Sequence, residues 1–490
     1  MSESGLVVRG ELQVGNPYNS DFYEVPTDPK GEISTQQFHD MKKIFKYVKI
    51  SAPLEAFYNE NGATYSVGNA SFHFLLYTYL KINLPGLSVK REFRNKVRIA
   101  WCKNIGHVIS GNGQLKINEN YVMSFDRVWM DHKSMYFLKP KEGGRVSYDT
   151  SVGNIPMLQE FSSVLPPFKL APAQPFYYAK DLSMAFPLIH LKDGEKLNHS
   201  YIHQLSLANL IRIRLYDEQT DTWSDVKSPE NIATLGAKFI DGWRTKIENP
   251  VLWGAFNFKN EIEVKWHKCR SKVYFIEDVI VIDQENQSSL GSCATMPINS
   301  KYPAVAVFWS AENHEAMEMN NHCNYTTNAS DHEKGWSPIS KTDISSGGAP
   351  RYKGYDDVMS EVEAREHFPS CPCELGYYAM SYANEPDSID AETGLVTADR
   401  VTVLKVHLGD TDPMKKLKTD NSEGNEAQKE INFKDYIEGP KKTDKKDGGD
   451  YVVRVRVLVT KKLEFIGEGN NITFKVDDLD SKPSTKKASD

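Results

Sequence analysis

The chain has little of what several common protein classes need. Its 490 residues include only six cysteines, too few and too scattered for a disulfide framework, so we expect reduced thiols. No apolar run reaches the roughly 18–20 residues of a membrane-spanning helix. Met1–Gly10 lacks the basic and then apolar stretch of a secretory signal. We therefore expect neither a disulfide-stapled secreted domain nor a protein anchored by a transmembrane helix.

An excess of positive charge is also missing. Lys and Arg number 59 against 66 Asp and Glu, which gives a net charge of −7. Binding to bare nucleic acid relies on neutralising phosphates with basic residues, so we predict no direct nucleic-acid binding. The sequence contains no Gly-x-x-x-x-Gly-Lys phosphate loop and no Gly-x-Ser-x-Gly nucleophile elbow. Neither motif therefore points to an enzyme.

What is present is hydrophobic alternation with a period of two. In Tyr451–Val459 every second residue is valine, and Arg454 and Arg456 lie between them. This pattern is typical of a β-strand with one buried face. The nearly continuous apolar run Val273–Ile282 indicates a strand covered on both faces. Five further strands are predicted in the same way, at Ser71–Leu80, Lys96–Trp101, Leu210–Tyr216, Ala304–Trp309 and Arg400–Leu408.

Long helical patterns are scarce. Only Phe38–Tyr47 and Tyr355–Glu366 have the spacing expected of short helices. Many short strands separated by turn residues are typical of β-sandwiches or barrels, and a chain of this length needs two such units to keep each core within normal size. We interpret the polar stretches 310–375 and 409–450 as long loops.

Two blocks of motifs resemble a known family. The first runs from Trp101-Cys-Lys-Asn-Ile-Gly-His107 to Leu115-Lys-Ile-Asn118. The second joins Val152-Gly-Asn-Ile-Pro-Met-Leu158 to an aromatic strand and a Pro-Leu-Ile run within Pro175–Leu191. Together they resemble the major capsid proteins of the nucleocytoplasmic large DNA viruses. Weaker matches extend the resemblance over most of residues 40–475, and the stretches 310–375 and 409–450 depart from it.

The resemblance implies an all-β fold with two consecutive eight-stranded antiparallel jelly-roll sandwiches and long loop insertions. The expected division of the chain is an N-terminal arm at 1–44, a first jelly roll at 45–217, a linker at 218–268, a second jelly roll at 269–476 and a tail at 477–490. Leu207–Tyr216 is expected to close the first unit.

The resemblance also implies a structural function without catalysis or cofactor. Three chains would form a pseudo-hexagonal capsomer, and capsomers would tile an icosahedral shell. The expected partners are further copies of the chain, minor capsid and penton proteins, and inner membrane-associated viral proteins. The expected location is the virion capsid, assembled in the host cytoplasm.

Two other functions compete with a shell subunit, because a jelly roll can host several. One is a minor capsid paralogue or assembly scaffold of the same fold. The other is a carbohydrate-active or carbohydrate-binding jelly-roll protein. A glycosidase would need two paired carboxylates. The neighbours Glu277 and Asp278 lie in a predicted strand, so they should point to opposite faces and not form such a pair.

Few residues suggest a site. His107 is interpreted as a strand-end histidine bonded to backbone, with a catalytic or metal role as the alternative. Gly106 is expected to supply a backbone conformation that a side chain disfavours. His367, Cys371 and Cys373 are candidate metal ligands, with Cys323 or His322 as a fourth, although a plain loop with small thiols is the other interpretation.

Three aromatic residues are predicted to make exposed-loop or trimer contacts. They are Trp336, Tyr352 and Tyr355, which lie in the predicted loop 310–375. Loops gather at the ends of a sandwich, where insertions disturb the core little. We therefore expect this loop to form the outward-facing crown of the capsomer.

Deletion of residues 1–40 should separate folding from assembly. This stretch has too little apolar periodicity to contribute to a core. We expect the truncated chain to melt within a few degrees of the full chain and to give fewer assembled particles in electron micrographs. A truncated chain that no longer folds would contradict the expected arm boundary.

Overall fold

The computed structural model describes residues 49–60, 62–69, 72–138, 144–181, 184–258, 264, 272–388, 391, 401–412, 451–468 and 471–477, with Lys49, 466–468 and 471–477 described by backbone alone. The predicted arm, the helix predicted at Phe38–Tyr47, most of the 409–450 stretch and the tail after residue 477 lie outside the described residues.

The first unit is a sandwich of two five-stranded antiparallel sheets. One sheet contains, in order, β1 (Lys49–Pro53), β16 (Val251–Asn257), β4 (Phe74–Leu84) and β10 (Phe168–Leu170), and β11 (Phe186–Pro187) also pairs with β4. The other has the order β2 (Glu55–Asn59), β3 (Gly62–Gly68), β12 (Lys196–Ile202), β7 (Asn112–Ile117) and β8 (Asn120–Phe125). Buried residues alternate along β12, so one face of this sheet points into the core.

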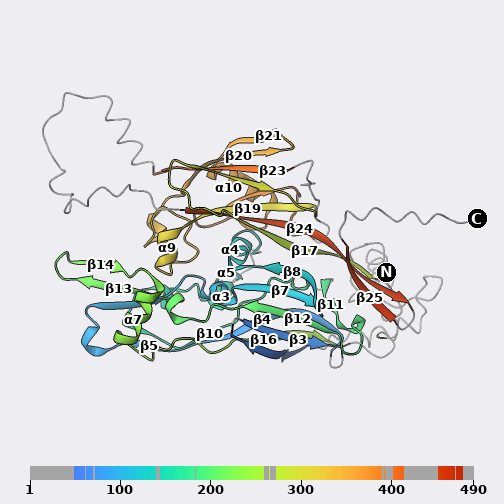
Figure 1. Cartoon of the computed structure of the whole chain (residues 1–490), viewed down its shortest axis with the longest axis horizontal. Coiled ribbons are helices and arrows are strands. Elements are labelled where there is room, and N and C mark those ends of the chain that lie inside the picture. The colour runs from blue at the N-terminus through green and yellow to red at the C-terminus, as the bar shows by residue number, and fades with distance from the viewer. Residues whose placement is uncertain are drawn as a thin grey trace, which may run out of the picture.

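Two small sheets extend the first unit at the left of Figure 1. One pairs β14 (Thr222–Asp225), β13 (Ile211–Asp217) and β6 (Val97–Trp101), and the other pairs β15 (Ile240–Asp241), β5 (Leu87–Val89) and β9 (Val164–Leu165). The strands predicted at Lys96–Trp101 and Leu210–Tyr216 are therefore confirmed. They pair with each other outside the main sandwich, so the expectation that the latter closes the first unit is wrong.

The second unit is a sandwich of the same kind (Figure 1). One sheet has the order β17 (Lys272–Asp283), β24 (Tyr451–Glu468), β19 (Ala304–Asn313) and β22 (Tyr378–Ser381), with β25 (Asn471–Asp477) also on β24. The facing sheet has the order β18 (Cys293–Ile298), β23 (Thr402–Leu408), β20 (Ile339–Ser346) and β21 (Ala349–Tyr355). Trp309 and the alternating valines of β24 fill the core between them. The predicted all-β fold with two successive jelly-roll sandwiches is confirmed.

Helices surround and separate the sandwiches. They are α3 (Ile105–Ser110), α4 (Arg127–Tyr136), α5 (Gly144–Val152), α6 (Pro156–Gln159), α7 (Pro229–Phe239), α9 (His314–Glu318) and α10 (Asp357–His367), with 3-10 turns at Arg91–Phe93, Tyr177–Ala179, Leu188–His190, Leu207–Asn209 and His332–Lys334. The helix predicted at Tyr355–Glu366 corresponds to α10. No helix in the described part of the chain is long and apolar enough to cross a membrane.

Helix α4 was not predicted from the sequence, although it lies between the two sandwiches (Figure 1). Eight of its ten residues are buried. A helix that is covered on nearly every side has no polar stripe, so the 3.6-residue alternation by which surface helices are recognised is absent. Its first turn is stabilised by Asp126, whose carboxylate accepts a hydrogen bond from the backbone N–H of Trp129 at 2.9 Å.

The stretch 218–268, expected as a linker, is not one. It contains β14, α7 and β15, and its strand β16 pairs with both β1 and β4 in a main sheet. The first sandwich is therefore closed by β16, well beyond the expected boundary at residue 217. Most residues of β16 are buried, so its sequence does not alternate and has no period-two signal.

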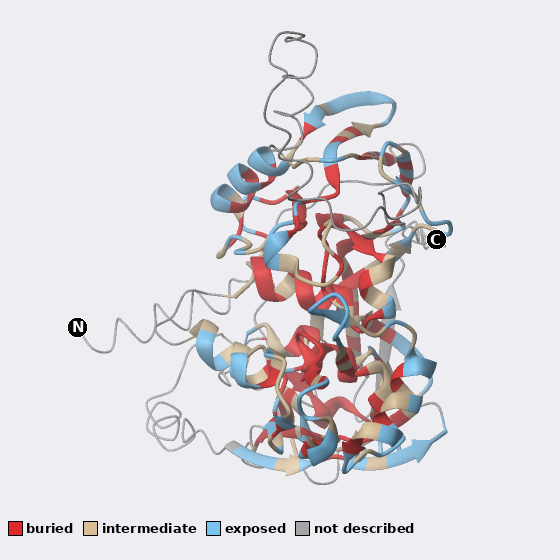
Figure 2. Cartoon of the chain, turned by 90° about the vertical axis from the view of Figure 1, so that its left-hand side faces the viewer, coloured by how far each residue is buried: buried red, intermediate tan, exposed pale blue. Residues whose placement is uncertain are grey.

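The stretch 310–375 is not a long loop either. It contains the end of β19, then α9, β20, β21 and α10. Its asparagines Asn320, Asn321 and Asn324 are buried, and the side chain of each donates to backbone carbonyls. Asn320 donates to Ala208 and Ile211 of the first unit at 2.6 and 2.7 Å. The polar composition therefore reflects buried hydrogen bonding as well as exposure, and in Figure 2 the exposed part at the top is mainly the β20–β21 hairpin and α10.

Candidate functional site at the junction of the two sandwiches

The two sandwiches meet across an unusually polar junction. The first unit contributes α3, α4 and β8, and the second contributes β17, β19, β24 and the segment 320–326 (Figure 1). Several charged side chains are buried here, among them Asp131, Asp278, Glu312, Arg456 and Lys461. A buried charge is costly unless it is paired and hydrogen-bonded, so the geometry of each pair matters.

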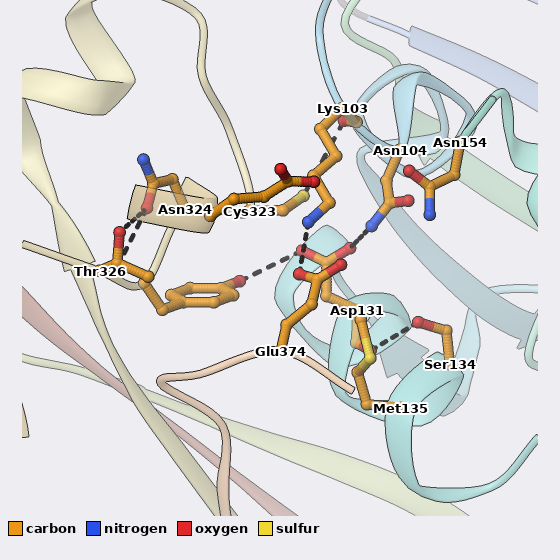
Figure 3. Close-up of polar contacts among 12 residues, drawn as sticks. Lys103, Asn104, Asp131, Ser134, Met135, Asn154, Cys323, Asn324, Thr326 and Glu374 are labelled. Carbon is orange, nitrogen blue, oxygen red and sulfur yellow. Dashed lines mark hydrogen bonds and ion pairs between the residues drawn. The ribbon is translucent and has the colours of Figure 1, made fainter. Parts of the chain in front are cut away.

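Asp131 of α4 is the centre of one buried cluster (Figure 3). Its carboxylate accepts a hydrogen bond from Nδ1 of His107 and one from the side-chain amide of Asn104 at 3.2 Å. The hydroxyl of Tyr325, from the second unit, donates to its other oxygen at 3.1 Å. The imidazole of His107 continues the network, because its Nε2 lies 2.8 Å from the hydroxyl of Tyr148. Asp131 therefore joins both units.

The charges of the cluster are fixed by its surroundings. Burial on its own would raise the pKa of Asp131, but the hydrogen bond and charge of His107, together with Arg127, outweigh it and lower that pKa. Burial raises the pKa of the nearby Cys323 thiol well above its usual value. The carboxylate thus stays ionised and the thiol stays neutral, which suits a structural contact.

His107 is not the strand-end residue that the sequence predicted. It lies in α3, and both of its ring nitrogens contact side chains instead of backbone. Gly106 also has a different role from the one expected. A Cβ atom at Gly106 would lie 3.0 Å from Cα of Val152, so glycine allows α3 and α5 to approach closely and does not supply a left-handed turn.

A second cluster is built on Arg456 of β24, whose side chain is 1% exposed. Its guanidinium contacts both carboxylate oxygens of Asp126, with Nε at 3.0 Å from each, and donates to Asp283 at 2.7 Å. Such forked pairing is the strongest arrangement available to an arginine. Because Asp126 also caps α4, the start of this first-unit helix is tied to a central strand of the second unit.

Glu312 at the end of β19 extends this cluster. It is buried and accepts hydrogen bonds from Arg127 of the first unit and from Nε of Arg454 at 3.0 Å. Burial opposes its ionisation, but the two arginines outweigh that effect and lower the pKa of Glu312. Arg454 in turn lies 2.9 Å from Asp283, so the two clusters share one chain of alternating charges.

Two further carboxylates of β17 contact the first unit. Asp278 accepts from the hydroxyl of Tyr121 at 3.0 Å and from the backbone N–H of Ser124 at 2.8 Å, and it also pairs with Lys461. Glu277 pairs with Lys180. The two neighbouring carboxylates therefore serve different cations and do not face each other as a catalytic pair would.

The buried ion pairs of the junction bear on the relative orientation of the two sandwiches. Replacing a buried ion pair by apolar residues is often harmless, whereas removing one partner leaves an uncompensated charge and is strongly destabilising. Any other arrangement of the two sandwiches would break several pairs at once. We infer that the ionic clusters favour the observed relative orientation of the two units over others.

The structure does not bring the candidate metal ligands together in one metal site, although Cys323 and Cys373 line the same cavity of about 350 Å³ as His332 and Glu374. The imidazole Nδ1 of His367 lies 3.2 Å from the carbonyl of Asn384, and Cys371 and Cys373 are exposed thiols. Cys323 is buried at the junction, and His322 contacts the carbonyl of Asn209 at 3.1 Å. Within the described ranges no group of three or more His, Cys, Asp or Glu is arranged to hold a metal ion.

The three predicted contact aromatics lie in different environments. Trp336 is 40% exposed and Tyr352 is half-buried, so both remain predicted contact residues. Tyr355 is buried at the end of β21, packs on the ring of Trp309 and donates its hydroxyl hydrogen to the carbonyl of Ala379. Its prediction as an exposed-loop contact is wrong, because its side chain points to the inner face of the sheet.

The sequence analysis did not identify His132, a buried polar side chain of α4 at the junction. It is fully buried among the rings of Phe308, Tyr136, Tyr325 and Tyr377, whose centroids lie between 5.3 and 6.3 Å from its own. Neither ring nitrogen has a hydrogen-bond partner. Burial penalises the charged imidazole and lowers the pKa of His132 to about 3.

This burial predicts that the chain loses stability in mild acid. The unfolded histidine takes up a proton near pH 6.5 and the folded one near pH 3. The free energy of unfolding that depends on neutral His132 is therefore fully present above pH 6.5 and is lost as the pH falls towards 3. The loss should reach about 2 kcal/mol at pH 5. His132→Phe should flatten the fall in unfolding free energy between pH 7 and 5, measured by urea denaturation, relative to the control His314→Phe, at a partly exposed histidine. Equal slopes would contradict this assignment.

The charge cluster can be tested at the cap of α4. Asp126→Asn keeps a capping side chain but removes the negative charge opposite Arg456, so we expect a loss on the order of 3 kcal/mol in unfolding free energy. Glu361→Gln breaks the exposed pair with Arg365 and should cost less than about 1 kcal/mol. Similar losses for both variants in chemical denaturation would show that the junction is not held by this charge.

The sequence has relatives of known role. No family model matches it. The major capsid protein of Invertebrate iridescent virus 6 is 21% identical over 339 residues, which cover 65% of this chain and 70% of that protein. The major capsid protein of Simulium iridescent virus is 21% identical over 390 residues, which cover 72% and 76% of the two chains. These relatives are structural proteins, in agreement with the expectation that the chain is not an enzyme.

Solved structures share the fold. A chain of PBCV-1 VP54, fitted into a reconstruction of the virophage Sputnik, matches with a TM-score of 0.60 and 10% identity over 88% of this chain and 96% of that one. The Faustovirus major capsid protein matches with a TM-score of 0.60 and 7% identity over 85% and 90%. The chain is therefore a structural protein with the double jelly-roll fold, related to the major capsid proteins of the nucleocytoplasmic large DNA viruses.

Proposed function

We propose that the chain is the main building unit of an icosahedral virus shell and that three copies form each capsomer. The chain contains two sandwiches of the same kind, each made of two facing antiparallel sheets. Three chains then present six similar wedges around one axis, which gives a nearly hexagonal outline. Such an outline can tile a curved lattice with one type of subunit.

The observation that carries this proposal is the buried ionic junction. A shell subunit must keep its shape while it contacts several neighbouring subunits. Asp126, Asp131, Glu312 and Arg456 bind partners across the boundary between the sandwiches, so the two wedges of one chain cannot shift independently. The hinge that usually separates two domains is thereby replaced by a fixed contact.

The proposed partners are those that a subunit of a virus shell would contact. They are neighbouring capsomers, minor capsid and penton proteins, and inner membrane-associated viral proteins, with the virion capsid as the location and the host cytoplasm as the place of assembly. We also propose that the chain divides into a first jelly roll that runs from residue 45 to β16 and a second at 269–476. A minor capsid paralogue or scaffold would differ by being scarce in purified particles.

The oligomeric state tests the proposal. Light scattering on the purified full chain at micromolar concentration should give three times the chain mass of 55.6 kDa. If a chaperone is needed for folding, it should be co-expressed and then removed. A folded chain that stays monomeric would argue strongly against the trimeric capsomer, and quantifying the chain in purified virions would separate a major from a minor component.

A further inference from the structure

A groove runs along the boundary of the two sandwiches, next to the junction. It has a volume of about 530 Å³, which is within the usual range for sites that bind small molecules. Its lining comes from the end of β12, the start of β7, the last residues of β17 and the first part of β24. Both units therefore contribute to it, and the proposed shell function makes no use of it.

Two buried polar atoms at this groove lack a partner. They are Nη1 of Arg127, from α4 of the first unit, and Nδ1 of His322, from the second unit, and neither forms a hydrogen bond with any described residue. Both residues line the groove. A buried polar atom without a hydrogen bond is costly and rare. A ligand that satisfies both atoms would therefore be favoured in this position.

The two atoms need a ligand that both accepts and donates. A guanidinium nitrogen only donates, so Nη1 of Arg127 needs an acceptor. Nε2 of His322 lies 3.1 Å from the carbonyl oxygen of Asn209, which only accepts, so the ring proton is on Nε2. Burial and the charge of Arg127 lower the pKa of His322 to about 4, which leaves its ring neutral and its Nδ1 an acceptor. A hydroxyl group can accept from the first atom and donate to the second.

The charges around the groove are already balanced. The arginines that line it are Arg127, Arg454 and Arg456. Each of them pairs with one or two of the carboxylates of Asp126, Asp283 and Glu312. Three positive charges thus face three negative ones. An anion would compete with these carboxylates and a cation with these arginines, so the ligand should be uncharged.

The walls of the groove add amide and aliphatic groups. Asn112 and Gln114, at the start of β7, are exposed and have side-chain amides. Ile202 of β12 is 63% exposed, and Val281 of β17 is 45% exposed. An amide has both a donor and an acceptor and can pair with neighbouring hydroxyls, whereas aliphatic side chains pack against C–H groups. A sugar ring has hydroxyls around its edge and C–H groups on its faces.

We propose that the groove binds an uncharged monosaccharide unit, whose hydroxyls pair with Arg127 and His322 and whose C–H groups contact Ile202 and Val281. A single water molecule satisfies the two buried atoms but fills only a small part of the volume. An apolar ligand leaves both atoms unpaired. Since Arg127 and His322 come from different sandwiches, the bound sugar joins them. The inference does not depend on the proposed trimer.

Saturation-transfer NMR on the purified full chain tests the site. The probes are glucose, galactose, mannose and N-acetylglucosamine, each as the free sugar and as its methyl glycoside. We expect saturation transfer to at least one of them at millimolar concentration. Cyclohexanol, which has a six-membered ring but one hydroxyl, should receive none, because it cannot satisfy both buried atoms and the wall amides. The uronate of the binding sugar should bind more weakly, because it is an anion.

The same experiment identifies the source of the sugar. Equal binding of the free sugar and its methyl glycoside would assign the groove to the end of a glycan chain. Binding of the free sugar alone would assign it to small soluble sugars. No saturation transfer to any of these sugars, or equal transfer to cyclohexanol, would overturn the inference.

Variants place the binding in the groove. Gln114→Ala removes a wall amide at an exposed position, so the chain should keep its thermal midpoint and bind the sugar about tenfold more weakly. Gln287→Ala, at an exposed glutamine outside the groove, is the matched control and should bind normally. His322→Phe removes the buried acceptor and should abolish binding. If that variant does not fold, Gln114→Ala decides. Unchanged affinity in Gln114→Ala, or an equal loss in both glutamine variants, would contradict the proposed site.

Binding should also stabilise the docked arrangement of the two sandwiches. A ligand that contacts both of them binds the folded chain and not the unfolded one, so the thermal midpoint should rise with sugar concentration. A sugar of the set that gives no saturation transfer is the control, because sugars also stabilise proteins in general by exclusion from their surface. The extra rise over this control should be smaller in Gln114→Ala. Equal rises with both sugars would count against a bound ligand.

Discussion

The structure depends on the pairing of charges that are buried between two β-sandwiches. Arg456 is almost wholly removed from solvent and is balanced by Asp126 and Asp283, which come from opposite sides of the boundary. A buried guanidinium without its carboxylates would be costly, so arrangements of the two units that separate Arg456 from Asp126 are disfavoured. Apolar packing alone would hold the sandwiches together but would tolerate small rotations between them. The ionic contacts remove that freedom.

The helix α4 transmits this constraint through the molecule. Its cap, Asp126, binds the arginine of β24, and one turn further on Asp131 accepts from Tyr325 of the second unit. The next residue, His132, lies against the ring of Tyr136 of the first unit and those of Phe308 and Tyr377 of the second. A single buried helix thus has a charged contact, a hydrogen-bonded contact and an apolar contact with the opposite sandwich. This concentration of roles explains why its sequence is neither amphipathic nor uniformly hydrophobic.

The strands could be predicted from the sequence far better than the junction. Alternation along β24 and β23 follows from one buried face and is visible in a window of a few residues. Strand β16 and helix α4 were missed because they are covered on nearly every side. The partners of the buried charges are distant in the chain, as with Asp126 and Arg456, which are 330 residues apart. In the sequence, Arg454 and Arg456 look like the polar face of strand β24. Only the folded structure shows that they form ion pairs inside the molecule.

The same residues connect the inside of the subunit to its outer surface. Asp283, Arg454 and Arg456 hold the junction, and they also line the groove between the sandwiches. A change that disturbs the pairing would therefore alter the shape and charge of the groove before it unfolds either sandwich. Because residues of both units line this groove, only a correctly docked pair of sandwiches forms it completely.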